Sequence, residues 1–310
     1  MSKVLPSTSR NRTPRAGLRL RRAQTRCLRV SLGHYENFLV LGPLTPLRLV
    51  PHLAALYAFC RHSDDLADEI KDPVEAVRRL EEWEEELRRS LEGEPSHPIT
   101  RSLAWTAARY DLPAALFHDL LSAFRQDLTI HRFATFNDLR NYTRRSADPV
   151  GRLVLRLYGH NDPELDALSD SICTGLQLAN FCQDVGDDAR RERIYIPLDE
   201  CMQFGVDPDD ILNGNYTPAL DRLLRFQIVR AYKFLNAGMS LPEKLPGKFR
   251  VSVRLFILGG LQILNQVQKN PMTTLSRRVK LGVFQKPGLL LKSFKPIPGN
   301  MVSSAKGDHG

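Results

Sequence analysis

Acid–proline and threonine–proline pairs recur along the chain, and they constrain its fold more than any other feature. Aspartate, asparagine and threonine cap helix starts, and proline is tolerated at the first helical position because its missing N–H would have no partner there. Such starts lie at Asp72-Pro73, Asp111-Leu112-Pro113, Asn137-Asp138, Asp148-Pro149, Asp162-Pro163 and Thr217-Pro218. We find no convincing run of alternating strands with hairpin turns. The chain is therefore expected to form one all-α domain.

Apolar residues at helical spacing support these starts. They continue from Val74 to Leu91 within a highly charged segment, which predicts a helix with one solvated face. An unusually long helix is expected from about Glu164 to Asp188, and a final apolar helix from about Phe249 to Lys269.

The net charge of +9 is concentrated at the two ends of the chain. Residues 1–30 hold nine basic residues and no acid, and residues 271–310 hold seven basic residues and one acid. Residues 31–270 carry a net charge of −6. We expect a basic, disordered N-terminal segment over 1–30, a globular domain over 31–270 and a basic, poorly structured tail over 271–310.

The composition favours a cytoplasmic protein. The five cysteines form no C-x-x-C pair, which indicates reduced thiols, and no run approaches the ~18 apolar residues of a membrane-spanning helix. Basic ends can serve nucleic acid, an anionic membrane surface or no function. No nucleic-acid-binding module is present, so no nucleic acid is expected. Peripheral contact with the inner face of an anionic membrane is the preferred alternative, and a solvated leader without function stays open.

The first acidic motif follows an apolar stretch in the segment 57–69. Positions three and four apart share a helix face, so Tyr57, Arg61, Asp64 or Asp65, and Asp68 lie together. Burying several carboxylates on one face is costly unless a cation accompanies them. Oxygen ligands without histidine or cysteine suit Mg²⁺, which commonly bridges carboxylates to phosphate oxygens.

The second motif lies at the end of the long expected helix. Gln177, Asn180 or Phe181, Asp184 and Asp188 share one face, and Asp187 adds another acid. Basic residues follow directly and could bind outer phosphate oxygens. An acid pair on one helix is usually a solvated face, but two pairs in apolar helices, each with arginine, predict a Mg²⁺–diphosphate site.

The segments Arg-His-Ser-Asp-Asp-Leu-Ala-Asp-Glu and Asn-Phe-Cys-Gln-Asp-Val-Gly-Asp-Asp-Ala-Arg-Arg-Glu-Arg-Ile-Tyr-Ile-Pro together resemble those of the squalene/phytoene synthase family. The likeness covers roughly residues 33–270. It implies an isoprenoid-synthase helical bundle with a central cavity, three Mg²⁺ ions and catalytic D-x-x-x-D motifs at Asp64/Asp68 and Asp184/Asp188. Asp65 and Asp187 would support the metal. By the same resemblance Arg61 and Arg193 would contact diphosphate, and Tyr57, Gln177 and Asn180 would lie at substrate positions.

Two further segments, 33–38 and 144–153, resemble the bacterial hopanoid-pathway branch of this family. That branch is implied to convert presqualene diphosphate into hydroxysqualene by ionisation, rearrangement and water capture. Arg145 stands where one-enzyme squalene synthases are expected to carry a tyrosine. A guanidinium cannot act as a base, so Arg145 favours the second half-reaction and a diphosphate-binding role. A surface position for Arg144 and Arg145 is equally open.

This interpretation predicts an enzyme that uses an isoprenoid diphosphate and Mg²⁺, with pathway enzymes as possible partners. NADPH is not expected, since it is needed only for direct squalene formation. One alternative is a head-to-head prenyltransferase that makes presqualene diphosphate, squalene or phytoene from two allylic diphosphates. A non-catalytic homologue acting as an assembly factor is disfavoured because both acidic motifs are intact.

Overall fold

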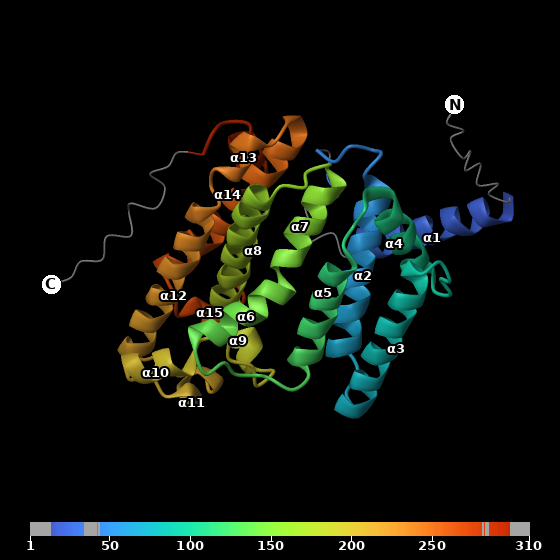
Figure 1. Cartoon of the computed structure of the whole chain (residues 1–310). Coiled ribbons are helices and arrows are strands. Elements are labelled where there is room, and N and C mark those ends of the chain that lie inside the picture. Colours follow the sequence, from blue (N-terminus) through green and yellow to red (C-terminus); the bar gives the residue numbers. More distant parts are fainter. Residues whose placement is uncertain (1–13, 34–41, 43, 281, 283–284, 298–310) are drawn as a thin grey trace.

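The computed structural model describes residues 14–33, 42, 44–280, 282 and 285–297, and within them the chain forms α-helices and no strand (Figure 1). The N-terminal half comprises α1 (Pro14–Gly33), α2 (Val50–Asp68), α3 (Pro73–Leu91), α4 (Pro98–Tyr110), α5 (Ala114–Asp127), α6 (Phe136–Ser146) and α7 (Asp148–Leu157). The C-terminal half comprises α8 (Pro163–Gln183), α9 (Val185–Ala189), α10 (Leu198–Phe204), α11 (Pro208–Leu212), α12 (Pro218–Ala237), α13 (Leu241–Lys244), α14 (Gly247–Lys269), α15 (Thr273–Ser276) and α16 (Gln285–Ser293). The expected all-α fold is confirmed.

The helix starts follow the predicted caps closely. The side chains of Asp72, Asp162 and Thr217 accept hydrogen bonds from backbone N–H groups in the first turns of α3, α8 and α12. Helix α6 begins earlier than Asn137, because Thr135 and Asp138 form a reciprocal capping box. The predicted caps at Asp111 and Asp148 do not form: Asp111 ends α4, and Asp148 is the first residue of α7.

Two hydrophobic clusters lie side by side. One is built mainly on α8, α12 and α14, and the other on α2, α4 and α5. Figure 1 shows these two sets of helices on opposite sides of α7, and Val154 and Tyr158 of the α7 region contact both clusters. The molecule is therefore one continuous domain.

The expectation of a disordered segment over 1–30 is wrong for residues 14–30, which belong to α1. One face of α1 is buried: Ala23 is 2% exposed and Cys27 is fully buried in the cluster that contains α2. The Ser31 hydroxyl also donates a hydrogen bond to the carbonyl of Ala54 in α2. The sequence analysis missed this apolar face because it judged the segment by its basic residues. Residues 1–13 lie outside the described part of the chain.

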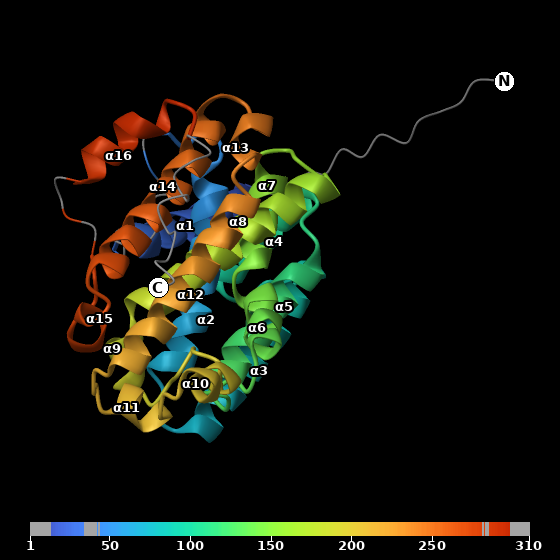
Figure 2. The same ribbon diagram turned by 90° about the vertical axis from the view of Figure 1, so that its left-hand side faces the viewer.

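The expectation of a poorly structured tail is also wrong for much of 271–297. Helix α16 packs against α14 with Leu289 7% exposed (Figure 2). The buried guanidinium of Arg254 donates to the carbonyls of Ser293 and Phe294, at 3.5 and 3.4 Å. Arg254 thus joins the C-terminal segment to α14, although its ion-pair partner is Glu243, 2.6 Å away. Positions 34–38 of the resembling segment 33–38, and residues 298–310, lie outside the described residues.

None of the helices in the described ranges is long and apolar enough to cross a lipid bilayer.

Candidate active site

The first acidic motif lies in the last turns of α2. The Arg61 guanidinium pairs with Asp64 at 3.4 Å between Nη1 and Oδ2, and Nη2 contacts Asp65. The Nε group of Arg61 is buried without a hydrogen-bond partner. Arg61 is thus anchored by its own helix while retaining donor capacity for an anion. Tyr57 lies half-buried one turn earlier on the same face.

The sequence predicted one continuous helix through the second motif, but the structure breaks it. Helix α8 ends at Gln183, Asp184 has φ −107° and ψ 14°, and α9 starts at Val185. Beside this break Gly186 lies so close to α15 that a Cβ atom there would be 2.1 Å from the Leu275 carbonyl oxygen. The Asp188 N–H still donates to the Asp184 carbonyl at 2.8 Å, so the two acids keep helical spacing.

Arginines bring the two motifs together. Asp68 on α2 accepts from Arg191 Nη1 at 2.9 Å and from Arg193 Nη2 at 3.0 Å, both in the loop after α9. This loop is held in turn by the segment between α5 and α6, because the Ile194 N–H donates to the His131 carbonyl at 2.8 Å. Two sequence-distant acidic segments therefore form one charged site.

Burial changes the ionisation of these carboxylates. Loss of water contact raises the pKa of Asp64 to about 6, and Asp68 nearby adds to the effect. Burial raises the pKa of Asp184 to about 6 against the opposing charge of Arg278. The pKa of Asp188 rises to about 7 through burial and the neighbouring Asp184. A raised pKa means that the ionised carboxylate is destabilised in this site, and a bound cation would stabilise it.

Asp127 is a site residue that the sequence analysis missed. It ends α5, its Oδ1 atom is buried without a hydrogen-bond partner, and Tyr142 donates to its Oδ2 atom at 3.0 Å. Burial raises the pKa of Asp127 to about 7, although Tyr142 and Arg193 both lower it. The sequence did not point to Asp127 because no second acid lies three or four positions from it to mark a shared helix face.

Aromatic rings line the same region. Phe181 of the second motif stacks on Tyr195 with ring centroids 4.1 Å apart, and Tyr195 lies 6.0 Å from Tyr142. Burial raises the pKa of both tyrosines well above the usual range, so they stay neutral. Neutral aromatic faces beside buried carboxylates can stabilise a positive charge.

Arg278 is a second residue that the sequence analysis missed. It follows α15, and its Nε atom lies 2.9 Å from Asp184 Oδ1. The adjacent Val279 carbonyl accepts a hydrogen bond from the Gln183 side chain. The tail composition showed an excess of basic residues, and nothing in their spacing linked one of them to Asp184.

The remaining predicted substrate residues are distributed differently. Gln177 is half-buried on α8, whereas Asn180 is exposed. Arg145 does not join the acidic motifs within the described residues: it donates to Ser122 Oγ at 3.0 Å and also contacts Gln126, both on α5. It lines a separate cavity of about 250 Å³ together with three other arginines and three aspartates. The diphosphate-binding role of Arg145 therefore stays a prediction, since its contacts here are with α5 and not with the acidic motifs.

The donor set fits magnesium bound together with a diphosphate. The candidate ligands are carboxylates alone, and the Asp65 and Asp184 Oδ1 atoms are buried without a hydrogen bond although each contacts an arginine. No three His, Cys, Asp or Glu side chains of the described residues converge as a complete metal cage. Mg²⁺ usually takes one or two protein carboxylates and completes its shell with water and phosphate oxygens.

Comparisons with known proteins agree with this fold. The Squalene/phytoene synthase family model matches residues 32–285, so the chain belongs to that family of enzymes of isoprenoid head-to-head condensation. The solved structure of squalene synthase HpnC from Alicyclobacillus acidocaldarius is 39% identical, has a TM-score of 0.78 and covers 82% of this chain and 96% of its own. A phytoene synthase of Arthrospira platensis is 30% identical, covering 84% of this chain and 88% of its own. A dehydrosqualene synthase structure, 23% identical with a TM-score of 0.81, covers 89% and 97% of the two chains and supports the fold alone.

Proposed function

We propose that this enzyme ionises presqualene diphosphate in the presence of Mg²⁺, rearranges the resulting cation and lets water capture it, giving hydroxysqualene on the route to squalene and hopanoids. The observation that carries ionisation is the bridge from Asp68 to Arg191 and Arg193, which joins the two acidic motifs. The 39% identity to squalene synthase HpnC supports the choice of pathway.

The cation and anion sites would be divided among the side chains described above. Asp64, Asp65, Asp68, Asp184, Asp187 and Asp188 would hold Mg²⁺, which neutralises the diphosphate leaving group. Arg61, Arg191 and Arg193 would donate to phosphate oxygens, exchanging their present carboxylate partners for the substrate. The C–O bond breaks with its electron pair leaving on the diphosphate.

The buried Asp127–Tyr142 pair would serve the later half of the reaction. Aromatic faces of Phe181 and Tyr195 would stabilise the carbocation after ionisation. The unpartnered Oδ1 atom of Asp127 would accept the proton that water loses when its oxygen bonds the cation. Tyr142 would orient that carboxylate through its hydrogen bond to Oδ2.

A second candidate is condensation of two allylic diphosphates to presqualene diphosphate, squalene or phytoene. The 30% identity to a phytoene synthase favours it. The position of Arg145 argues against it, because a guanidinium cannot take the proton-transfer role of a phenol.

Product analysis separates the two candidates. Purified protein and Mg²⁺ are incubated separately with presqualene diphosphate and farnesyl diphosphate, and with geranylgeranyl diphosphate as a further allylic substrate. Mass spectrometry should find hydroxysqualene from the first and no condensation product from the others. Phytoene, squalene or presqualene diphosphate from an allylic substrate would replace the proposal with the second candidate.

A further inference from the structure

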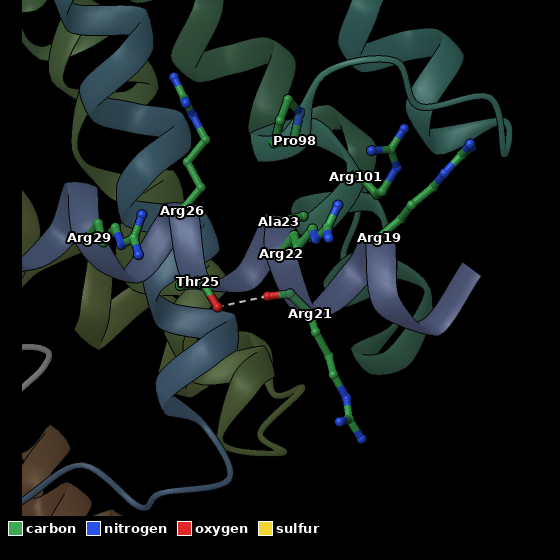
Figure 3. A pocket seen from close by; sticks show the side chains of 9 residues that line it. All are labelled: Arg19, Arg21, Arg22, Ala23, Thr25, Arg26, Arg29, Pro98 and Arg101. Atoms are coloured by element: carbon green, nitrogen blue, oxygen red, sulfur yellow. Dashed lines mark hydrogen bonds between the residues drawn. The ribbon is translucent and has the colours of Figure 1, made fainter. Parts of the chain in front are cut away.

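An arginine-rich surface on α1 and α4 lies apart from the acidic site. A cavity of about 540 Å³ is lined by Arg19, Arg21, Arg22, Ala23, Thr25, Arg26, Arg29, Pro98 and Arg101. In Figure 3, Arg19, Arg26 and Arg101 extend on the side of α1 where Pro98 lies, and Arg21 extends to the opposite side. We call these nine residues the arginine surface.

The arginine surface carries uncompensated charge. None of its six arginines forms an ion pair with another described residue, and α1 contains no acidic residue. The guanidinium of Arg101 donates to the Pro95 carbonyl at 2.6 Å, a neutral partner. Arginines of α3, by contrast, pair with glutamates on the same helix. Six unpaired guanidinium groups create a positive field that attracts anions.

Two exposed leucines distinguish this surface from a purely ionic one. Leu18 is 51% exposed and Leu32 is 55% exposed. With Arg22, Thr25 and Arg29 they are spaced four and three residues apart, so they form one outward stripe of α1. The opposite face, with Ala23 and Cys27, is buried in the protein. The helix therefore presents cationic groups flanked by a leucine at each end of the stripe.

We propose that the arginine surface and its flanking leucines dock the enzyme on an anionic lipid bilayer. Guanidinium groups bind lipid phosphates in a bidentate manner, and leucines beside them can enter the headgroup boundary. The arginines from Arg19 to Arg29 extend over about 15 Å of helix, which is longer than one diphosphate. Exposed leucines on the stripe also have no role in contacts with nucleic acid phosphates.

Docking would keep the enzyme beside the lipid phase in which its product dissolves. The proposed product hydroxysqualene is a long hydrocarbon chain with a single hydroxyl group, and bilayers dissolve such molecules far better than water does. Helix α1 packs on the N-terminal half of α2, and the acidic motif ends that same helix. The proposal concerns binding alone, so it can be tested independently of the reaction that the enzyme catalyses.

Vesicle co-sedimentation of the full chain tests the proposal. Wild type should bind phosphatidylglycerol-containing vesicles, bind pure phosphatidylcholine weakly, and dissociate as salt rises. Each arginine near an anionic surface adds about fivefold to the partition coefficient, so Arg22→Ala/Arg29→Ala should weaken binding about 30-fold. Arg22→Lys/Arg29→Lys should retain most of it, because the charge remains.

A matched control removes the same charge from another face. Arg222→Ala/Lys233→Ala changes two exposed cations on α12, which Figure 1 shows on the other side of the molecule from α1. This control should bind vesicles like wild type. Leu18→Ala/Leu32→Ala should weaken binding without changing its salt dependence, because the leucines carry no charge.

Several results would overturn the proposal. Equal losses in the α1 and α12 variants would mean that only net charge matters. Absence of vesicle binding by the folded wild type would reject the surface outright. Calorimetric binding of inorganic diphosphate, or binding of DNA, that disappears in Arg22→Ala/Arg29→Ala while vesicles do not bind would assign the surface to that other anion. Circular dichroism confirms folding of each variant.

Discussion

Half-buried carboxylates give the site its chemical character. Surface acids such as Glu75 are paired with arginines and stay ionised, whereas Asp64, Asp127, Asp184 and Asp188 lose water and hold protons more tightly. A buried acid with a raised pKa is costly for folding unless a cation or proton accompanies it. Its retention beside arginines is typical of a binding site.

Asp127→Asn tests the proposed proton acceptor. An amide keeps the size of the side chain but cannot take a proton, so kcat should fall about 100-fold while KM changes little. Glu81→Gln on the exposed face of α3 is the control and should leave kcat unchanged. Steady-state kinetics with presqualene diphosphate measure both. An unchanged kcat in Asp127→Asn would remove Asp127 from the reaction.

The dependence of stability on pH tests the burial of Asp188. Its pKa rises from 3.8 to about 7 on folding, so the folded state binds more protons than the unfolded state between these values. The contribution of Asp188 to stability is therefore fully present below about pH 4 and is lost as pH rises through about 7.

The variant Asp188→Asn removes this contribution. Its melting temperature in the ligand-free state should fall less than that of wild type between about pH 5 and about pH 8. Thermal denaturation followed by circular dichroism measures both slopes. Equal slopes would contradict the raised pKa.

At the scale of elements, the close contact of α9 with α15 shapes the second motif. Gly186 has no room for a side chain beside the backbone of Leu275 and Thr274. Arg278 lies directly after α15, and it pairs with Asp184. A helix break, a glycine and a distant arginine are thus parts of one arrangement.

Gly186→Ala should disrupt this arrangement. Its Cβ would lie 2.1 Å from a carbonyl oxygen, and such overpacking typically costs about 1–3 kcal/mol. We expect a lower melting temperature and a large loss of turnover. Gly259→Ala on α14, where no atom lies within 4 Å of the added Cβ, should retain both. Equal behaviour of the two variants would refute the close contact.

Arg278→Ala tests the ion pair with Asp184 directly. Loss of the cation removes the interaction that lowers the pKa of Asp184, so more of this carboxyl should be protonated near neutral pH. Activity should then need higher pH or more Mg²⁺. Arg277→Ala, at the exposed neighbouring position, is the control. An unchanged pH–activity profile in Arg278→Ala would contradict the pairing.

Local chemistry explains which elements the sequence could predict. Helix starts at Asp72, Asp162 and Thr217 depend on caps within one turn, so they were found correctly. The acidic motifs were visible because positions four apart share a helix face. The break at Asp184 lies beside the contact of Gly186 with Leu275, and no local sequence pattern contains a contact between residues so far apart in the chain.

At the scale of the whole molecule, the basic ends are part of the fold where the structure describes them. Judging the ends by net charge missed the buried face of α1 and the contacts of α16, because both segments combine apolar and basic residues. Asp127 and Arg278 were missed for a related reason: each reaches the site only through tertiary packing. Composition therefore misjudged the boundaries of the domain and part of its site.

Truncation after Asn270 tests the structural role of the C-terminal segment. It removes buried Leu275 and Leu289 and leaves Arg254 without its contacts to Ser293 and Phe294. Each lost apolar side chain costs about 1.5–3 kcal/mol, so the free energy of unfolding should fall by several kcal/mol. Denaturant titration measures the change. An unchanged free energy of unfolding would contradict a structural role for the segment.

The central claim is that two acidic motifs on separate helices act as one diphosphate-ionising site. Release of diphosphate from presqualene diphosphate in the presence of Mg²⁺ tests it most directly, using wild type, Asp64→Ala, Asp184→Ala and the control Glu81→Gln. The account predicts release by wild type and the control, and none by either motif variant with intact helical circular dichroism. Full release by Asp64→Ala or Asp184→Ala would contradict it.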